Sequence, residues 1–300
     1  MEEDHPAVIH KPKEANFIEC HNLFAFLAQP ELGGNLDVME IFGGESGVSK
    51  IGIRRKLKTG KVLDLVPGFD PTQVADQKIL VEYIYQHQPM VIVAGPPRTV
   101  FANLSRINRW KNPDTYAKSR RTGLILARLM AIVAEIQMNG NRYFLIENPA
   151  GSELFDLPEF RKIWSTDKIG RIIFPQCSVG LETPEGEPIH KLTELWAIAK
   201  ELLIPFEGIE GEFTTHGAMV GTYHGQRRSK LAQVWPPGMC ERIVEGITLL
   251  LKKIGNSRQQ YQFLQFPVEE TLAPKPKGRP RKYPEAAVFD CTACRSSKPW

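Results

Sequence analysis

The sequence predicts an α/β fold with a doubly wound, mostly parallel sheet and helices on both of its faces. From residue 36 to about residue 180, short apolar segments alternate with amphipathic segments of ten or more residues. This alternation is the sequence pattern of βαβ units. A packed core is expected, because 42% of the 300 residues are hydrophobic and 24% are charged. We expect a folded domain over 36–265, an N-terminal extension over 1–35 and a flexible basic tail over 266–300.

The expected elements follow from the spacing of apolar residues and from the glycines and prolines between them. Beyond residue 182 the pattern loosens, and 188–196 is predicted as an extended segment that enters a helix. In chain order, we expect a strand over 38–42, a helix over 48–57, a strand over 61–65, a helix over 71–87, a strand over 90–94, a helix over 114–139, strands over 142–147 and 169–174, and a last helix over 238–255.

The net charge and the cysteines indicate which partners and which cellular compartment to expect. The net charge of +4 permits nucleic-acid binding without requiring it. The acidic N-terminus lacks the apolar segment of a secretory signal, and no apolar run approaches the length of a membrane span. Five cysteines, an odd number at irregular positions, indicate a reducing compartment and no disulfide framework. We expect a monomer in the nucleus or cytosol, with no membrane partner.

A glycine-rich turn, Gly43-Gly44-Glu45-Ser46-Gly47, lies between the first expected strand and its helix. Such a turn lets the backbone approach a ligand and leaves N–H groups free at the helix start. Asp64 ends the second expected strand, twenty residues after Gly44. At this spacing a carboxylate can accept hydrogen bonds from ribose hydroxyls. A nucleoside cofactor site is the interpretation we favour over a tight turn followed by a solvated acid.

Two further turns follow expected strands. Gly95-Pro96-Pro97-Arg98 comes after the strand over 90–94, and Ile146-Glu147-Asn148-Pro149 ends the strand over 142–147. In open α/β sheets, ligands bind outside the carboxyl ends of the strands. Glu147 is therefore a candidate site residue, although a turn acid that caps the following loop would have the same position in the sequence.

The order of these three turns resembles that of the cytosine-carbon-5 DNA methyltransferases. The resemblance covers residues 36 to about 250, and Glu40–Gly47 is similar to the S-adenosylmethionine loop of that family, with Ser46 in place of a glycine. It implies the Rossmann-like fold of S-adenosylmethionine-dependent methyltransferases, with Asp64 on the ribose and Asp70 on the adenine. The cofactor-binding residues that it implies are Phe42, Gly43, Gly44, Gly47, Asp64, Asp70 and Pro96.

The resemblance departs at the nucleophile. In the family, the Pro-Pro turn is followed by a cysteine that adds to carbon 6 of a flipped cytosine, whereas this chain has Arg98 there. A guanidinium stays protonated and cannot add, but it can pair with a phosphate or a base edge. Glu147 matches the acid that holds the Watson–Crick edge of the target base. Cys177 is the best substitute nucleophile, because it follows Gln176, the retained residue of the Gln-x-Arg-x-Arg motif; the alternative is a small buried residue at a strand end.

Two later segments extend the resemblance. Lys191–Trp196 is similar to a Lys-x-Thr-x-Leu-Trp pattern of methyltransferase-like domains, many of them encoded in mobile elements, and Trp235-Pro236-Pro237 is similar to the last motif of the family. The segment between Gln176 and Trp235 is too short for a large, separately folded DNA recognition domain.

Basic residues suggest contact with DNA at two places. Arg106, Arg109 and Lys111 follow the Pro-Pro turn, where the resemblance implies a loop that closes over DNA; a solvated helix face is the alternative. Arg279 and Arg281 flank Pro280 in an AT-hook-like motif, which is also typical of a nuclear localisation signal. Farther on, Cys291-Thr292-Ala293-Cys294 supplies only half of a zinc site, so no metal is expected.

Two functional hypotheses remain open. The first is an S-adenosylmethionine-dependent DNA methyltransferase-like protein, impaired in ordinary carbon-5 chemistry. The second is a DNA-binding pseudoenzyme, without activity, that keeps the methyltransferase fold and binds DNA partly through the AT-hook-like tail. A plain Rossmann-like oxidoreductase is disfavoured by the Gly-Pro-Pro and Glu-Asn-Pro turns.

Overall fold

A computed structural model describes residues 35–61, 69–98, 100–102, 105–166, 168–211 and 213–265 of the chain. The chain divides into two compact units, residues 1–257 and 258–300, and the site lies in the first. Nearly all of the expected N-terminal extension, most of the strand expected over 61–65, and the tail over 266–300 lie outside the described residues.

Among the described residues, the sheet has five strands in the order β1-β2-β3-β5-β4. Strands β1, β2 and β3 pair in parallel, and β5 pairs antiparallel with both β3 and β4. This confirms the predicted α/β class with a mostly parallel sheet. A parallel bridge from Val38 to Thr59 lies just ahead of the strand expected over 61–65. The strands are β1 Val38–Ile41, β2 Val91–Ala94, β3 Tyr143–Pro149, β4 Ile169–Pro175 and β5 Leu192–Ile198.

At 188–196 the predicted extended segment is confirmed by strand β5, whereas the predicted entry into a helix is wrong. The segment is a seven-residue strand, buried along most of its length on both faces of the sheet. A strand covered on both faces lacks the alternation of a half-exposed strand, so its apolar run cannot be distinguished from a buried helix by periodicity. Its position between β3 and β4 places Leu195 opposite both Glu147 and Ile172.

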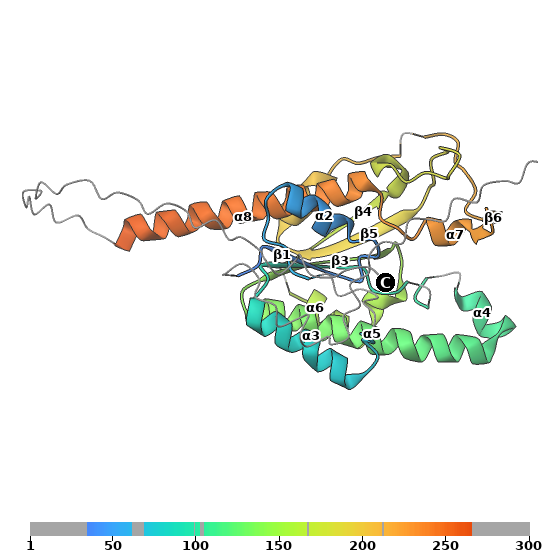
Figure 1. Ribbon diagram of the computed structural model, residues 1–300, viewed down its shortest axis with the longest axis horizontal. Coiled ribbons are helices and arrows are strands. Elements are labelled where there is room, and N and C mark those ends of the chain that lie inside the picture. Colours follow the sequence, from blue (N-terminus) through green and yellow to red (C-terminus); the bar gives the residue numbers. More distant parts are fainter. Residues whose placement is uncertain are drawn as a thin grey trace, which may run out of the picture. The chain divides into compact units, whose positions relative to one another are not determined.

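Helices cover both faces of the sheet, as predicted (Figure 1). Helices α3, α5 and α6 lie on one face, and α2 and α8 lie on the other. Helix α8 continues past the end predicted at residue 255, to Gln265. The helices are α2 Gly47–Arg54, α3 Val74–His87, α4 Ser105–Lys111, α5 Pro113–Asn139, α6 Pro158–Trp164, α7 Arg228–Leu231 and α8 Pro237–Gln265.

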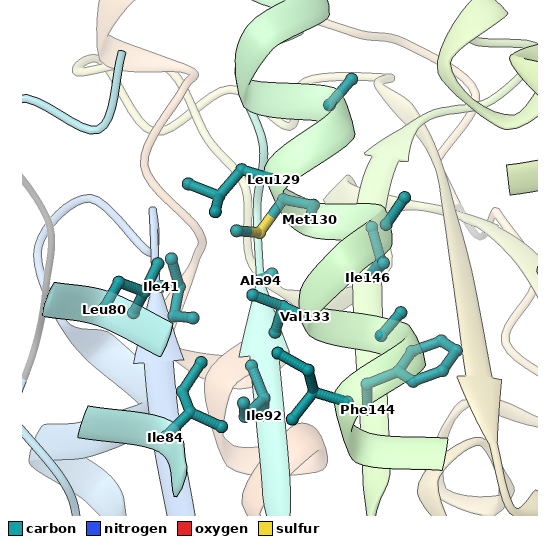
Figure 2. Packing of buried hydrophobic residues seen from close by; sticks show 14 of the residues in the cluster. Ile41, Leu80, Ile84, Ile92, Ala94, Leu129, Met130, Val133, Phe144 and Ile146 are labelled. Atoms are coloured by element: carbon teal, nitrogen blue, oxygen red, sulfur yellow. The ribbon is translucent and has the colours of Figure 1, made fainter. Parts of the chain in front are cut away.

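Two apolar clusters fix these layers. In the first, Ile41, Ile92 and Ile146 from three parallel strands pack against side chains of α3 and α5, among them Ile84 and Val133 (Figure 2). In the second, the opposite faces of the same strands meet α2 and α8. Burial of side chains on both faces of the sheet is the main stabilising contribution of such a fold. The strand and helix residues of the second cluster include Val38, Val93, Leu145, Val48, Met239, Ile243 and Ile247.

Helix α5 is long and apolar enough to cross a membrane by length and composition alone. Over half of the apolar window is buried within the protein, where Leu129, Met130 and Val133 contact the sheet. The helix therefore has a packing partner for its apolar side.

Shorter elements connect the sheet to its loops. A small antiparallel ribbon and four 3-10 helices occur among the described residues, and the 3-10 helix after β4 carries Gln176 and Cys177. These elements are β6 Thr222–Tyr223, β7 Gln226–Arg227, η1 Glu153–Asp156, η2 Gln176–Val179, η3 Lys200–Leu202 and η4 Ile204–Phe206.

Candidate functional site

The glycine-rich turn leaves β1 in an unusual backbone conformation. Phe42, Gly44 and Ser46 all have positive φ, at 57°, 66° and 61°. This region is strained for residues other than glycine. At Gly43 a side chain would be impossible without rearrangement, because an added Cβ would lie 2.0 Å from Oε1 of Glu40. The turn thus brings bare backbone to the carboxyl end of the sheet, where a ligand could approach it closely.

Glu40 anchors this turn to the following helix, a role that the sequence did not reveal. The side chain is fully buried, and its Oε2 accepts hydrogen bonds from the backbone N–H and the hydroxyl of Ser49, both at 2.8 Å. A carboxylate that binds donors near a helix start is favourably placed. The position of this acid within an otherwise apolar strand could have identified it from the sequence.

Two cavities open beside the turn. The first, of about 310 Å³, is lined by the sequence-predicted residues Phe42, Gly43 and Gly44 together with Arg98 and with Phe69, which precedes Asp70. The second, of about 280 Å³, shares Gly43 and is lined by Gly47 and residues of α2 and α8. The predicted loop residues are therefore divided between two cavities: Phe42 and Gly44 line the first, and Gly47 lines the second.

Three further predicted cofactor residues are placed differently. Asp70 is exposed, and Thr72 donates to its carboxylate through both the hydroxyl and the backbone N–H, which holds the pKa of Asp70 below its ordinary value. Pro96 is buried, and its carbonyl accepts a hydrogen bond from Nδ2 of Asn148 at 3.0 Å, while the flanking Gly95 and Pro97 line the first cavity. Asp64 lies outside the described residues.

Glu147 is the centre of a buried polar network at the end of β3. Its side chain is fully buried. One oxygen, Oε1, accepts from the hydroxyl of Thr193 and from Nε2 of Gln176, the latter at 3.4 Å. The other, Oε2, accepts from the indole N–H of Trp235 at 3.1 Å and lies 3.5 Å from Nη2 of Arg98. Both oxygens of the carboxylate are therefore occupied by groups of the protein itself.

The charges around Glu147 keep it ionised. Burial raises the pKa of this carboxyl group, but the positive charges of Arg98 and Lys191 and the hydrogen bonds from Thr193 and Trp235 together hold the pKa below its usual range. Lys191 is itself partly buried. Burial, with a further contribution from the charge of Arg98, lowers the pKa of Lys191 to about 7.

Arg98 connects this network to the first cavity. Its Nη2 also donates to the backbone carbonyl of Gln233 at 2.9 Å, and its side chain is 17% exposed. Its Nη1 is buried and has no hydrogen-bond partner among the described residues. Arg98, where the resemblance expects a nucleophile, is therefore half of an ion pair with Glu147.

Cys177, the substitute nucleophile, lies beside the network. Its side chain is 3% exposed and its Sγ lies 3.8 Å from Nε2 of His216. The preceding residue, Gln176, donates to Glu147 and accepts from Nζ of Lys191 at 3.1 Å. The sequence did not indicate the contact with His216, because 39 residues separate the two side chains.

The basic segment after the Pro-Pro turn is helical. Arg109 and Lys111 are exposed on α4, and the side chain of Arg106 lies outside the described residues. Trp110 is 83% exposed and lines a cavity of about 580 Å³ together with Arg109, Tyr116, Arg120 and Glu153. Arg279 and Arg281 lie outside the described residues. Among the described side chains, no group of three or more metal-ligating residues could hold a metal ion.

In the sequence analysis, Thr193, Lys191 and Trp235 were noted only as parts of motifs and not as site residues. In the structure they lie around Glu147. Strand β5 supplies Thr193, and the segment before α8 supplies Trp235. Each of them is a polar residue within an apolar segment, which could have marked it as a candidate. That pattern does not predict which side chains lie in contact.

Comparisons with known proteins found a weak structural likeness. No protein-family model and no curated protein matches the chain. The crystal structure of the S. pombe Dnmt2 methyltransferase is similar, with 11% sequence identity and a TM-score of 0.35. The match covers 62% of this chain and 58% of that chain, so this protein spans less than two thirds of that one. At this TM-score the likeness supports no conclusion about this chain, and its fold class rests on the sheet and helices described above.

Proposed function

We propose that this protein is a DNA-binding pseudoenzyme with a methyltransferase-like fold, which binds an adenosyl ligand and does not add to cytosine carbon 6. The observation that carries the proposal is the ion pair between Arg98 and Glu147 at 3.5 Å. It occupies both positions at which the resemblance expects chemistry, the nucleophile and the acid that holds the base. Arginine cannot serve as that nucleophile, because it carries no usable lone pair.

The lining and volume of the first cavity support the proposal of an adenosyl ligand. Its walls combine the aromatic side chains of Phe42 and Phe69 with the bare backbone of Gly43 and Gly44, and its volume of about 310 Å³ is that of a small-molecule site. The aromatic side chains would pack on the nucleoside, and the glycines would let the backbone approach it. Bound S-adenosylmethionine would supply an electrophilic methyl group. Asp64, twenty residues after Gly44, remains the proposed ribose ligand.

The proposal that the partner is DNA, and that the protein is nuclear, rests on positive charge. Arg109 and Lys111 are exposed beside Trp110, a combination suited to phosphates and unstacked bases. Arg279 and Arg281 would add contacts in a narrow A·T minor groove.

Calorimetric titration of the full chain with S-adenosylmethionine, followed by a labelled methyl-transfer assay on DNA, tests the proposal. We expect micromolar binding that Asp64→Ala abolishes and that Glu82→Ala, an exposed acid on α3, leaves unchanged. We expect no label on cytosine. Absence of binding by folded protein would exclude the adenosyl site, and label on carbon 5 would exclude the pseudoenzyme.

A second candidate function, an active methyltransferase that uses Cys177, is favoured by one observation, the Sγ of Cys177 lying 3.8 Å from Nε2 of His216. A histidine next to a cysteine is the arrangement in which a general base assists a thiol nucleophile. If this function holds, Cys177→Ser abolishes methyl transfer while binding of the adenosyl ligand persists. Methyl transfer that survives the substitution would exclude Cys177 as the nucleophile.

A further inference from the structure

The first part of helix α5 does not pack into the core. The buried residues of this helix begin at Gly123, and no side chain over 113–122 is buried. Helix α4 packs beside this end of α5, and its side chains over 107–111 are all exposed (Figure 1). We call residues 107–122 the arm. The side chains of the arm face solvent, where a partner can reach them.

The arm lies in a strongly basic part of the chain. Residues 98–121 include seven arginines and lysines and a single acid, Asp114. The side chains that the structure does not describe here, at 99 and 103–106, include no acid and so cannot neutralise this charge. Arg109 makes no ion pair with any described residue. A charge of this kind repels a second copy of the arm and attracts a polyanion.

The arm also exposes apolar side chains. Trp110 is 83% exposed and Ile107 is 51% exposed. The two residues are three apart in α4, so they are neighbours on one side of the helix. Within the described part of the chain, Trp110 makes no contact with another aromatic ring. An aromatic side chain this large therefore has both of its faces available to a partner.

Trp110 borders the cavity of about 580 Å³ between the arm and the 3-10 helix η1. The other lining residues are Arg109, Tyr116, Arg120 and Glu153, and none of them lines the first cavity. Arg120 and Glu153 form an ion pair at 2.8 Å, so their charges largely offset each other. The cavity thus combines two aromatic side chains with one unpaired cation, the guanidinium of Arg109.

This combination suits a nucleotide better than a cationic ligand. Two aromatic side chains could also hold a quaternary ammonium group. Arg109 opposes such a ligand, and the only acid of the described lining, Glu153, is already paired with Arg120. A nucleotide presents a flat base, which stacks on aromatic rings, and a phosphate, which pairs with arginine.

We propose that the arm binds an unpaired nucleotide of DNA, with its base stacked on Trp110 and its phosphate paired with Arg109. The inference rests on the proposed function for the identity of the polymer, and it adds the form in which DNA is bound. The bases of a duplex are stacked on one another, so a blunt duplex offers the arm its phosphates but no free base face. The preferred partner is therefore duplex DNA that continues into a single-stranded segment. Because this cavity shares no lining residue with the first, the contact is separate from the site around Glu147.

The test compares two labelled DNAs by fluorescence anisotropy of the full chain: a blunt duplex, and the same duplex with a short single-stranded overhang. We expect the overhang to tighten binding roughly 5- to 140-fold, the range for one stacked base. Trp110→Ala should lower this ratio of affinities at least about fivefold, and Trp110→Phe, which keeps an aromatic face, should retain most of it. Tyr85→Ala is the matched control, because Tyr85 is an aromatic residue of α3 that is 58% exposed, and it should leave the ratio unchanged.

Trp110 is exposed, so its replacement should not disturb folding, which thermal unfolding checks. Equal binding of the two DNAs by the wild type overturns the inference, and so does a ratio that falls less than about fivefold in Trp110→Ala, since added phosphates alone then account for the preference. Tighter binding of a trimethyl-lysine peptide than of the overhang duplex overturns it in favour of a cation site. Failure of the folded wild type to bind either DNA overturns the proposed DNA partner itself.

Discussion

Four segments of the chain meet at the carboxylate of Glu147. The turn after β2 supplies Arg98, the 3-10 helix after β4 supplies Gln176, β5 supplies Thr193, and the segment before α8 supplies Trp235. A buried carboxylate is tolerated only when its charge is balanced and its lone pairs are satisfied. The network thus ties the stability of the fold to the residues of the candidate site.

Removing one donor from this network should be costly. Thr193→Val keeps the shape of the side chain but deprives buried Oε1 of Glu147 of its hydroxyl donor. We expect a loss of about 1–3 kcal/mol in the free energy of unfolding, measured in urea. The control is Thr248→Val in α8, where the hydroxyl donates only to the carbonyl of Val244 one turn earlier, and which should change stability by less than about 0.5 kcal/mol. Equal effects of the two substitutions would contradict the network.

Ser46 should be replaceable by glycine with a gain in stability. It precedes α2 with φ of 61°, and its side chain makes no capping hydrogen bond. Left-handed backbone costs a residue with a Cβ about 1–2 kcal/mol, part of which the greater flexibility of unfolded glycine offsets. We expect Ser46→Gly to raise the free energy of unfolding by up to about 1 kcal/mol. A loss of stability would mean that the hydroxyl has a partner in solution.

Lys191 should make stability depend on pH. Its pKa is about 7 in the folded protein against an ordinary value of 10.5, so between these values the unfolded chain holds a proton that the folded protein lacks. Stability then rises as pH increases from about 7 to about 10. Lys191→Met should lose this rise, whereas Lys252→Met, at an exposed position of α8, should retain it. Parallel curves for Lys191→Met and the wild type, from urea unfolding at several pH values, would contradict the shift.

At the scale of elements, the position of a strand in the sheet determined whether the sequence pattern could identify it. The parallel strands β1, β2 and β3 have glycine and proline boundaries that mark them in the sequence. Strand β5 is buried between two neighbours, so its apolar residues carry no period of two. The same strand brings Thr193 to Glu147, so the element whose extent the sequence pattern missed also supplies a residue of the site.

Helix α8 offers a matched pair of glycines. An added Cβ at Gly246 would lie 2.8 Å from the backbone oxygen of Leu202, whereas one at Gly255 would meet nothing within 4 Å. Gly255→Ala should stabilise the protein by about 0.5–1 kcal/mol through helix propensity, and Gly246→Ala should destabilise it by about 1–3 kcal/mol through overpacking. Thermal and urea unfolding measure both effects. Stabilisation by both substitutions would show that α8 does not pack closely on the 3-10 helix Lys200–Leu202.

At the scale of the whole molecule, affinity for DNA should come from several basic segments at once. Neutralising two phosphate contacts with Arg109→Gln and Lys111→Gln should reduce the slope of log affinity against log salt by about 2. Arg128→Gln is the control, because Arg128 is already paired with Glu159 at 3.0 Å and should not affect the slope. Fluorescence anisotropy of the full chain with labelled duplex measures the slopes, and an equal reduction in all variants would exclude α4 as a contact.

The sequence by itself determined the class of fold and the candidates for the site. Alternation of apolar and amphipathic segments predicted the mostly parallel sheet, and the turns after strands pointed to Phe42, Gly43, Gly44, Arg98 and Glu147, because strand and turn signals are local. Only the tertiary structure decided that Arg98 pairs with Glu147, that Thr193 and Trp235 complete the network, and that Gly47 faces a different cavity. These are contacts between residues that are distant in the chain, and packing alone brings them together.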